Sequence, residues 1–173
     1  MDLYVILLRI VHIFSGVFWV GAVAFMVFFI QPTAVALGPD AQKFMQHLIF
    51  RRRLTDVVLT TAFLNVIAGI LLYWEASAGL RLDWITTGAG IGFTGGALAA
   101  FAALGVGFFV TRPAVLRMGA LGAEIQAAGQ PPTSEQEAEL HEIQDRSAKA
   151  GRWTLTLVGI ALLFMATARY LSF

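Results

Sequence analysis

Four stretches of the chain are apolar for long enough to cross a lipid bilayer: residues 3–30, 54–74, 85–110 and 154–171. A helix needs about 20 consecutive apolar residues to span the hydrocarbon layer, and each stretch reaches or approaches that length. The first stretch is longer than a span requires, so we expect its helix to tilt or to protrude from the bilayer. We expect that helix to end at Pro32, because proline cannot donate a backbone hydrogen bond.

The connection between the first two stretches keeps a helical pattern. Asp40 is placed to cap a short helix, because its side chain can accept hydrogen bonds from free backbone N–H groups. The apolar side of that helix comprises Ala41, Phe44, Met45 and Leu48. The helix runs into the basic triplet 51–53, so we expect it to lie at the membrane interface. Asp56 is expected to pair with Arg52 or Arg53.

The longest polar segment, residues 113–150, predicts a helical hairpin between the third and fourth spans. Its first arm is weakly amphipathic, and glycine and proline at 129–132 turn the chain. Ser134 and Glu137 fit a capping box that opens the polar second arm. Charged segments of this kind are usually solvated, so the plainer alternative is a loop helix that contacts no partner.

The composition agrees with this pattern. Hydrophobic residues make up 58% of the chain and charged residues 13%, and the mean hydropathy is +0.74. Soluble domains are nearer half apolar and a quarter charged. We therefore predict an all-α membrane protein: one integral domain, residues 1–173, folded as a bundle of four transmembrane helices. The chain has no cysteine, which excludes disulfides and thiolate ligands. Its first residues lack the basic segment of a cleaved signal peptide, and we expect none.

Basic residues are concentrated on one predicted side of the membrane. The first and third connections contain Lys43, Arg51, Arg52, Arg53, Arg112, Arg117, Arg146, Lys149 and Arg152. By the positive-inside rule, we expect loops 31–53 and 111–153, including the hairpin, to be cytoplasmic and both termini to lie outside. We expect the membrane to be a bacterial inner membrane. Topology already explains these basic residues, so they give no support to nucleic-acid binding.

Arg9 and His12 lie three residues apart within the first span, so a helix places both on one face. Ionisable residues within a span are costly and mark functional sites. Gly16 and Trp19 continue the same stripe, and we expect Gly16 to leave room beside the imidazole. A neutral imidazole can ligate iron, and an arginine can hold a propionate, so this stripe predicts a site for haem b or a similar flat ligand, with His12 as the metal ligand. The alternative is a histidine bonded to a neighbouring helix, with Arg9 extending toward water.

Other polar side chains are expected near the depth of His12. Counted from the helix rise, the second span reaches that depth near Tyr73 and Glu75, and the fourth span near Arg169 and Tyr170. We expect Tyr170 or Tyr73 to reach the imidazole and to complete a cofactor site. Glu75 could pair with Arg9 or Arg169, and the alternative is a set of exposed interfacial side chains.

Two small or polar stripes predict how the spans pack. The second span carries Thr61, Asn65, Gly69 and Tyr73 at every fourth position. This stripe should face the interior, and Asn65 is expected to bond another helix. The third span carries Gly88, Gly92 and Gly96, a spacing that permits close helix approach and predicts a contact with a second copy or with a larger membrane complex. The remaining histidines, His47 and His141, are expected to be ordinary surface residues.

Several of these residues also carry a resemblance to a known group. Leu8-Arg9-Ile10-Val11-His12, followed by Phe18-Trp19-Val20-Gly21, resembles the first span of the CopD-like and HemJ-like membrane proteins. Arg52-Arg53-Leu54, with the later Ala68-Gly69-Ile70-Leu71-Leu72, resembles their second span. The turn Gly129-Gln130-Pro131-Pro132-Thr133 looks closer to an uncharacterised predicted membrane family related to CopD.

The resemblance implies a four-span protein. HemJ-like proteins oxidise protoporphyrinogen and hold a b-type haem, and their first-span histidine corresponds to His12. Their basic haem-site residue on the third span has no counterpart at residues 84–88. CopD-like proteins are associated with copper uptake, and this chain lacks a path rich in methionine or histidine.

Three functions remain open at this point. The first is a small redox-type membrane protein that binds haem b or a similar flat ligand at His12. The second is a non-catalytic accessory or assembly subunit of a larger membrane complex. The third is transport of a metal or small ion, which would require oligomerisation. The sequence assigns no catalytic residue and leaves enzymatic activity open.

Overall fold

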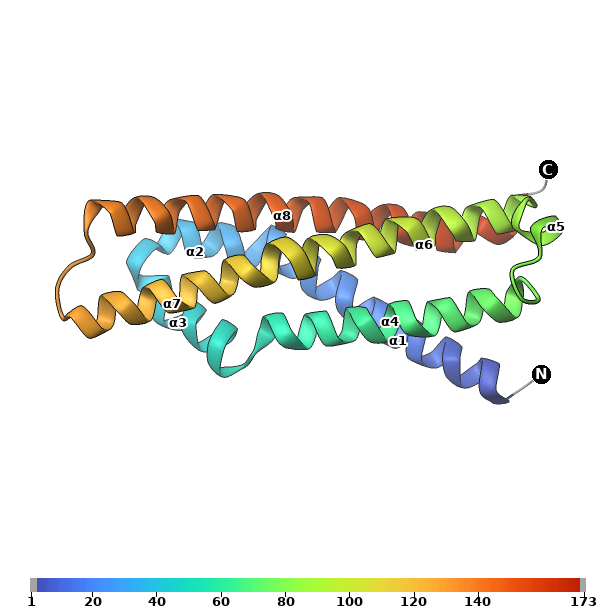
Figure 1. Ribbon diagram of the computed structural model, residues 1–173, viewed down its shortest axis with the longest axis horizontal. Coiled ribbons are helices and arrows are strands. Elements are labelled where there is room, and N and C mark those ends of the chain that lie inside the picture. Colours follow the sequence, from blue (N-terminus) through green and yellow to red (C-terminus); the bar gives the residue numbers. More distant parts are fainter. Residues whose placement is uncertain (1–2, 172–173) are drawn as a thin grey trace.

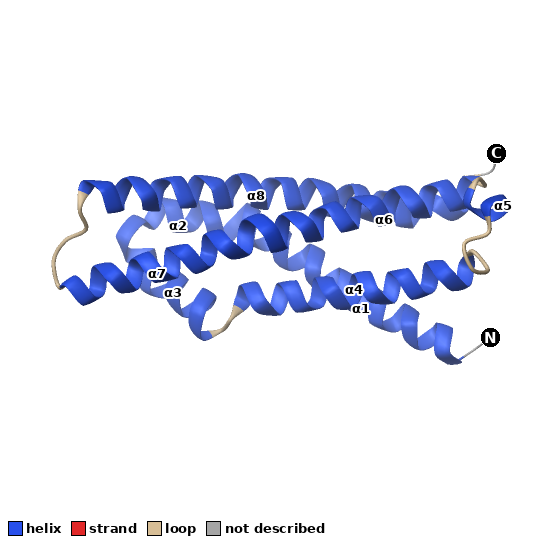
Figure 2. Cartoon of the chain, in the orientation of Figure 1, coloured by secondary structure: helices blue, strands red, loops and turns tan. Residues whose placement is uncertain are grey.

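The computed structural model describes residues 3–171, which form helices joined by short loops and contain no strand. Figure 2 shows the loops between helices before α4, on either side of α5, and between α7 and α8. The helices are α1 (Leu3–Phe25), α2 (Gln31–Leu37), α3 (Gln42–Gln46), α4 (Leu54–Ala76), α5 (Leu82–Ile85), α6 (Gly88–Val106), α7 (Arg112–Ala128) and α8 (Ser134–Thr167). Short 3₁₀ or π segments link them: η1 (Met26–Ile30), η2 (Gly38–Ala41), η3 (His47–Arg51), η4 (Gly107–Thr111) and η5 (Ala168–Tyr170).

Four continuous helical runs are long and apolar enough to cross a membrane, which confirms the predicted four-helix membrane bundle. They cover Leu3–Leu37, Leu54–Ala76, Gly88–Ala128 and Ser134–Tyr170. Three of these runs are longer than a bilayer requires, because the first continues through α2, the third continues through α7, and the fourth begins with the polar half of α8. The protein is therefore an integral membrane protein in which the polar segments extend the transmembrane helices.

The expectation that Pro32 ends the first helix was wrong, because the helix passes through it. The π segment η1 precedes this proline, and the N–H of Gln31 bonds the carbonyl of Met26, five residues earlier. The same arrangement precedes Pro113, where the N–H of Arg112 bonds the carbonyl of Gly107. A wider turn can accommodate a proline ring that would otherwise press on the carbonyl four residues earlier. Neither proline therefore breaks its helix.

The first connection forms a helical segment from η2 to η3, as its pattern predicts. Asp40 does not cap it, because the chain enters the helix through the 3₁₀ turn η2, and α3 has no side-chain cap. Arg53 adopts a left-handed conformation, with φ of 53°, and this kink separates η3 from α4. Its Nε lies 3.1 Å from Oδ2 of Asp56, which confirms the expected pair.

The predicted hairpin consists of α7 and the first half of α8, which pack against each other. Its cap lies one residue earlier than expected. The Thr133 side chain accepts a bond from the N–H of Gln136, and the Gln136 side chain accepts one from the N–H of Thr133. Arg117 joins the two arms, with its Nε 2.6 Å from Oε1 of Glu139. Leu121 is fully buried in the hairpin, so α7 is packed and not merely solvated.

The bundle is built from two helix pairs. α1 packs mainly on α4, and α6 packs mainly on α8. Figure 1 shows α1 crossing α4 obliquely, while α6 and α8 run side by side. The pairs meet at a small central core of Trp19, Ala62, Val66, Ala103 and Val158. The start of α1, the end of α8 and α5 lie at one end of the bundle, and the polar connections lie at the other (Figure 1).

Candidate functional site

His12 and Asn65 form a reciprocal contact between α1 and α4. Nδ1 of His12 lies 2.9 Å from the backbone oxygen of Asn65. The side-chain amide of Asn65 donates to the backbone oxygen of His12 at 2.7 Å. Each side chain thus bonds the main chain of the other residue, and Asn65 is buried. We call this pair of bonds the His–Asn clasp.

A glycine follows each member of the clasp at the fourth position and makes room for it. A Cβ on Gly69 would lie 3.0 Å from Cε1 of His12. A Cβ on Gly16 would lie 2.7 Å from Nδ2 of Asn65. Any larger residue at Gly16 or Gly69 would therefore press on the side chain that reaches across. The pattern His12–Gly16 on one helix is matched by Asn65–Gly69 on the other.

The clasp fixes the protonation of the imidazole at one nitrogen. A backbone carbonyl only accepts hydrogen bonds, so Nδ1 of His12 must carry a proton. The contact of 3.3 Å between Nδ2 of Asn65 and Nδ1 of His12 then joins two donors, and we do not count it as a hydrogen bond. In the neutral ring, Nε2 retains a lone pair. Metal-binding histidines have this arrangement, in which the other ring nitrogen donates to a carbonyl or a carboxylate.

The depth expected for His12 was wrong. The imidazole lies level with Asn65 and Gly69, and not with Tyr73 and Glu75. A count along the sequence treats the helices as parallel, whereas α1 crosses α4 obliquely (Figure 1). Tyr73 instead bonds α6, with its hydroxyl 2.6 Å from Oγ1 of Thr94.

The other residues predicted for the site do not gather around the imidazole of His12. Trp19 is 4% exposed and belongs to the central core. The space beside Gly16, expected to admit a ligand, is filled by the Asn65 side chain. Arg9 is exposed, and Tyr170 is 79% exposed at the end of the bundle.

The ion pairs proposed for this end of the bundle do not form. Within residues 3–171, the ion pairs are Arg53–Asp56, Arg81–Asp83, Arg117–Glu124 and Arg117–Glu139. Glu75 and Arg169 are exposed side chains, as the alternative interpretation states. At the same end, the Arg81 guanidinium hydrogen-bonds Asp83 and lowers the pKa of that carboxyl below its usual value. Arg81 and Asp83 belong to the loop and to α5, and they take no part in the bonds of the clasp.

Asn65 is the site residue whose role the sequence only partly indicated. Its expected bond to another helix is confirmed by its contact with α1. Its pairing with His12 was not foreseen, because the estimated depths separated the two residues. The signal that could have found it is the shared spacing, a polar residue followed four positions later by glycine on both spans.

The glycine stripe of the third span packs inside the chain. A Cβ on Gly88 would overlap the backbone oxygen of Leu171, and one on Gly92 would lie 2.8 Å from Cβ of Ala168. A Cβ on Gly96 would lie 3.0 Å from Cε of Met165. The face expected to contact a partner is therefore covered by the end of α8 and by the segment that follows it. An oligomer or a larger complex stays a prediction, and it would need a different surface.

A comparison of the chain with protein-family models, with curated proteins and with solved structures found no match. Within residues 3–171, no three histidine, aspartate or glutamate side chains are grouped so that they could hold a metal ion. A function for this protein must therefore be argued from the His–Asn clasp and from the surfaces around it.

Proposed function

We propose that this protein is a small, redox-type integral membrane protein that binds haem b, or a similar flat ligand, through Nε2 of His12. The observation that supports the proposal is the bond from Nδ1 of His12 to the backbone oxygen of Asn65. This bond holds the proton on Nδ1 and leaves the lone pair of Nε2 for a metal. When bound, a haem would supply one-electron chemistry at this place.

The residues around the clasp fit such a ligand only in part. His12 fits as an axial ligand, and exposed Arg9, three residues away on the same helix, can pair with a carboxylate. Gly16 and Trp19 do not contribute, because Asn65 fills the first position and the core encloses the second. A flat ligand would therefore approach the imidazole from the side away from Asn65. The resemblance to HemJ-like proteins agrees with haem binding at His12, and we base no further residue or activity on it.

The rival proposal is a non-catalytic accessory or assembly subunit of a membrane complex. It is favoured by the two cross-helix bonds of the clasp, because the chain's own groups form both of them and they join α1 directly to α4. In this case His12 would have a purely structural role in joining α1 to α4. Both proposals include the same two bonds between His12 and Asn65. They differ only in whether Nε2 of His12 binds a metal.

An absorption spectrum of the purified protein, produced with ample haem, separates these proposals. The haem proposal expects a Soret band that His12→Gln removes, because glutamine can keep an N–H donor for the Asn65 carbonyl but cannot ligate iron. His47→Gln and His141→Gln are matched controls and should keep the band. A colourless wild-type protein, or a band that survives His12→Gln in a folded protein, would refute haem binding at this site.

We also propose the orientation of the bundle. The polar connections, at the end away from α5, contain most basic residues and would be cytoplasmic, with the termini outside, in a bacterial inner membrane. Single cysteines at Gly79 and Pro132, labelled by an impermeant reagent in intact cells, test this. Labelling is expected at Gly79 alone, and labelling at Pro132 alone would reverse the orientation.

A further inference from the structure

A groove of about 460 Å³ lies where the hairpin meets the transmembrane part of the bundle. One wall is α8, which contributes Glu142, Asp145, Arg146, Lys149, Ala150 and Trp153. The opposite wall is the junction of α6 and η4, which contributes Val106 and Val110. The groove shares no lining residue with the His–Asn clasp, so a ligand here is independent of the proposed function.

Polarity changes in order along this groove. Glu142, Arg146 and Ala150 follow one another at every fourth position of α8, and Trp153 comes three residues later, so they share one side of the helix. The groove is therefore acidic at its outermost turn, basic one turn deeper, and apolar where α8 enters the membrane. Val106 and Val110 extend the apolar part on the other wall. Tryptophan at this position is typical of the membrane interface.

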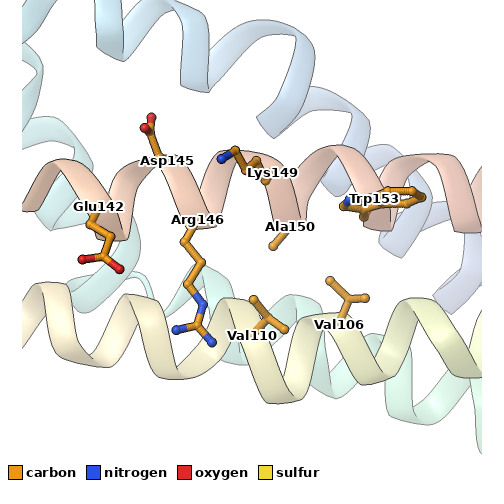
Figure 3. Close-up of a pocket in the computed structure, with 8 residues that line it drawn as sticks. All are labelled: Val106, Val110, Glu142, Asp145, Arg146, Lys149, Ala150 and Trp153. Carbon is orange, nitrogen blue, oxygen red and sulfur yellow. The ribbon is translucent and has the colours of Figure 1, made fainter.

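Of the four charged residues that line the groove, Glu142 and Arg146 face its opposite wall and are available to a ligand. Figure 3 shows Glu142 and Arg146 reaching from α8 toward the helix that carries Val110, whereas Asp145 and Lys149, which also line the groove, leave α8 in another direction. Glu142 and Arg146 are both exposed. Neither takes part in the ion pairs found between residues 3 and 171. Their order matches a molecule with a cation outermost, an anion next and an apolar chain innermost.

We propose that this groove binds a phospholipid whose headgroup combines a phosphate with a primary ammonium, as in phosphatidylethanolamine. Arg146 binds the phosphate, since a guanidinium can donate two parallel hydrogen bonds to its oxygens. Glu142 accepts hydrogen bonds from the ammonium. The acyl chain lies along Val106, Val110 and Trp153, in the part of the groove that enters the membrane.

Glu142 distinguishes this lipid from its common alternatives. An anionic headgroup such as phosphatidylglycerol has no cation for the carboxylate, and its negative charge would meet that of Glu142. A choline headgroup has a cation but no N–H to donate. A second hollow, lined by Lys149, Arg152, Trp153 and Thr156, contains no acid and adjoins the groove at Lys149 and Trp153. Arg152 therefore provides a control arginine on the same helix outside the proposed groove.

Native mass spectrometry of the detergent-solubilised full chain tests the proposal with added phosphatidylethanolamine, phosphatidylglycerol or phosphatidylcholine. The wild-type protein should retain phosphatidylethanolamine most strongly. Arg146→Gln should weaken that retention by roughly tenfold, since a charge-assisted hydrogen bond contributes at least about that factor to affinity. Glu142→Gln should remove the preference over phosphatidylglycerol while keeping a general affinity for phosphate.

Arg152→Gln and Glu135→Gln are the matched controls, and both should behave as wild type. Circular dichroism of each variant confirms that the helices persist, which is expected because all four side chains are exposed. Equal retention of the three lipids by the wild-type protein would overturn the proposal. An equal loss in Arg152→Gln and Arg146→Gln would also overturn it, because retention would then depend on basic charge alone.

Discussion

The two helix pairs of this bundle are joined in different ways. α1 and α4 are joined at one level by the His–Asn clasp, a pair of hydrogen bonds that two glycines make possible. α6 and α8 are joined by close backbone packing along successive turns, where glycines of α6 meet the end of α8 and the segment that follows it. Lipid provides no hydrophobic force between helices, so packing and polar contacts must hold each pair. The difference shows that glycine serves both purposes, by admitting a backbone in one pair and a polar side chain in the other.

The two kinds of contact should also differ in strength. Interhelical hydrogen bonds in membranes each contribute about 0.6–2 kcal/mol, because the separated helices find other partners. Close packing along the glycine stripe is lost in a different way. A side chain added at one of these glycines has no space, so the two helices must move apart. We therefore expect substitutions in the α6–α8 pair to destabilise the protein more than substitutions in the α1–α4 pair.

The largest effect is expected from Gly92→Leu. A Cβ at this position would lie 2.8 Å from Cβ and 2.9 Å from Cα of Ala168, so the backbone of η5, at the end of α8, would itself have to move. Overpacking of this kind costs about 1–3 kcal/mol or more, and thermal unfolding in detergent would measure it. Gly105→Leu is the matched control on the same helix, because a Cβ there meets no atom within 4 Å. Equal melting of the two variants would show that the glycine stripe does not hold this pair.

Asn65→Leu should have the next largest effect. It removes the donor to the His12 carbonyl and places a branched side chain against Gly16, at a cost of about 1–2 kcal/mol. The comparison is with Thr61→Val on the same helix, because the Thr61 hydroxyl bonds only carbonyls of its own helix. A loss no greater than that of Thr61→Val would mean that the clasp adds nothing to the α1–α4 pair.

Gly69→Ala tests the space beneath the imidazole and should have a smaller effect. The new methyl group would lie 3.0 Å from Cε1 and 3.3 Å from Nδ1 of His12, so the ring must shift by a few tenths of an ångström. Alanine also favours a helix over glycine by about 1 kcal/mol, which offsets much of that strain. Gly21→Ala, with open space around its Cβ, should gain the propensity alone and melt higher. If both variants melt together, the imidazole is not held closely against α4.

The sequence predicted the helices better than it predicted which helices pack against one another. Hydropathy identified the four spans, because a run of about 20 apolar residues is typical of a transmembrane helix. It also indicated that Gly92 lies on a close-packed face, but periodicity cannot tell whether the neighbour is α8 or a second chain. Pro32 was expected to end its helix, since a π segment that accommodates proline has no clear sequence signal. His12 and Asn65 were each identified, but their pairing depended on the crossing of α1 over α4.

The smallest effect is expected at the hairpin, where Arg117 and Glu139 join α7 to α8 outside the apolar parts of the spans. The hydrogen bond from Arg117 lowers the pKa of Glu139 below its ordinary value. A lowered pKa in the folded state means that the pair stabilises the hairpin above the ordinary glutamate pKa and loses that contribution as pH falls through the folded value. Both side chains are well exposed, so salt should screen their attraction.

Glu139→Gln should therefore lower the melting temperature slightly at neutral pH and low salt, and not in acid or high salt. Glu135→Gln, at an exposed position without an ion pair to another residue in 3–171, is the control. A difference between the Glu139 variant and wild type that persists in high salt would show that the hairpin depends on packing around Leu121 and not on this pair.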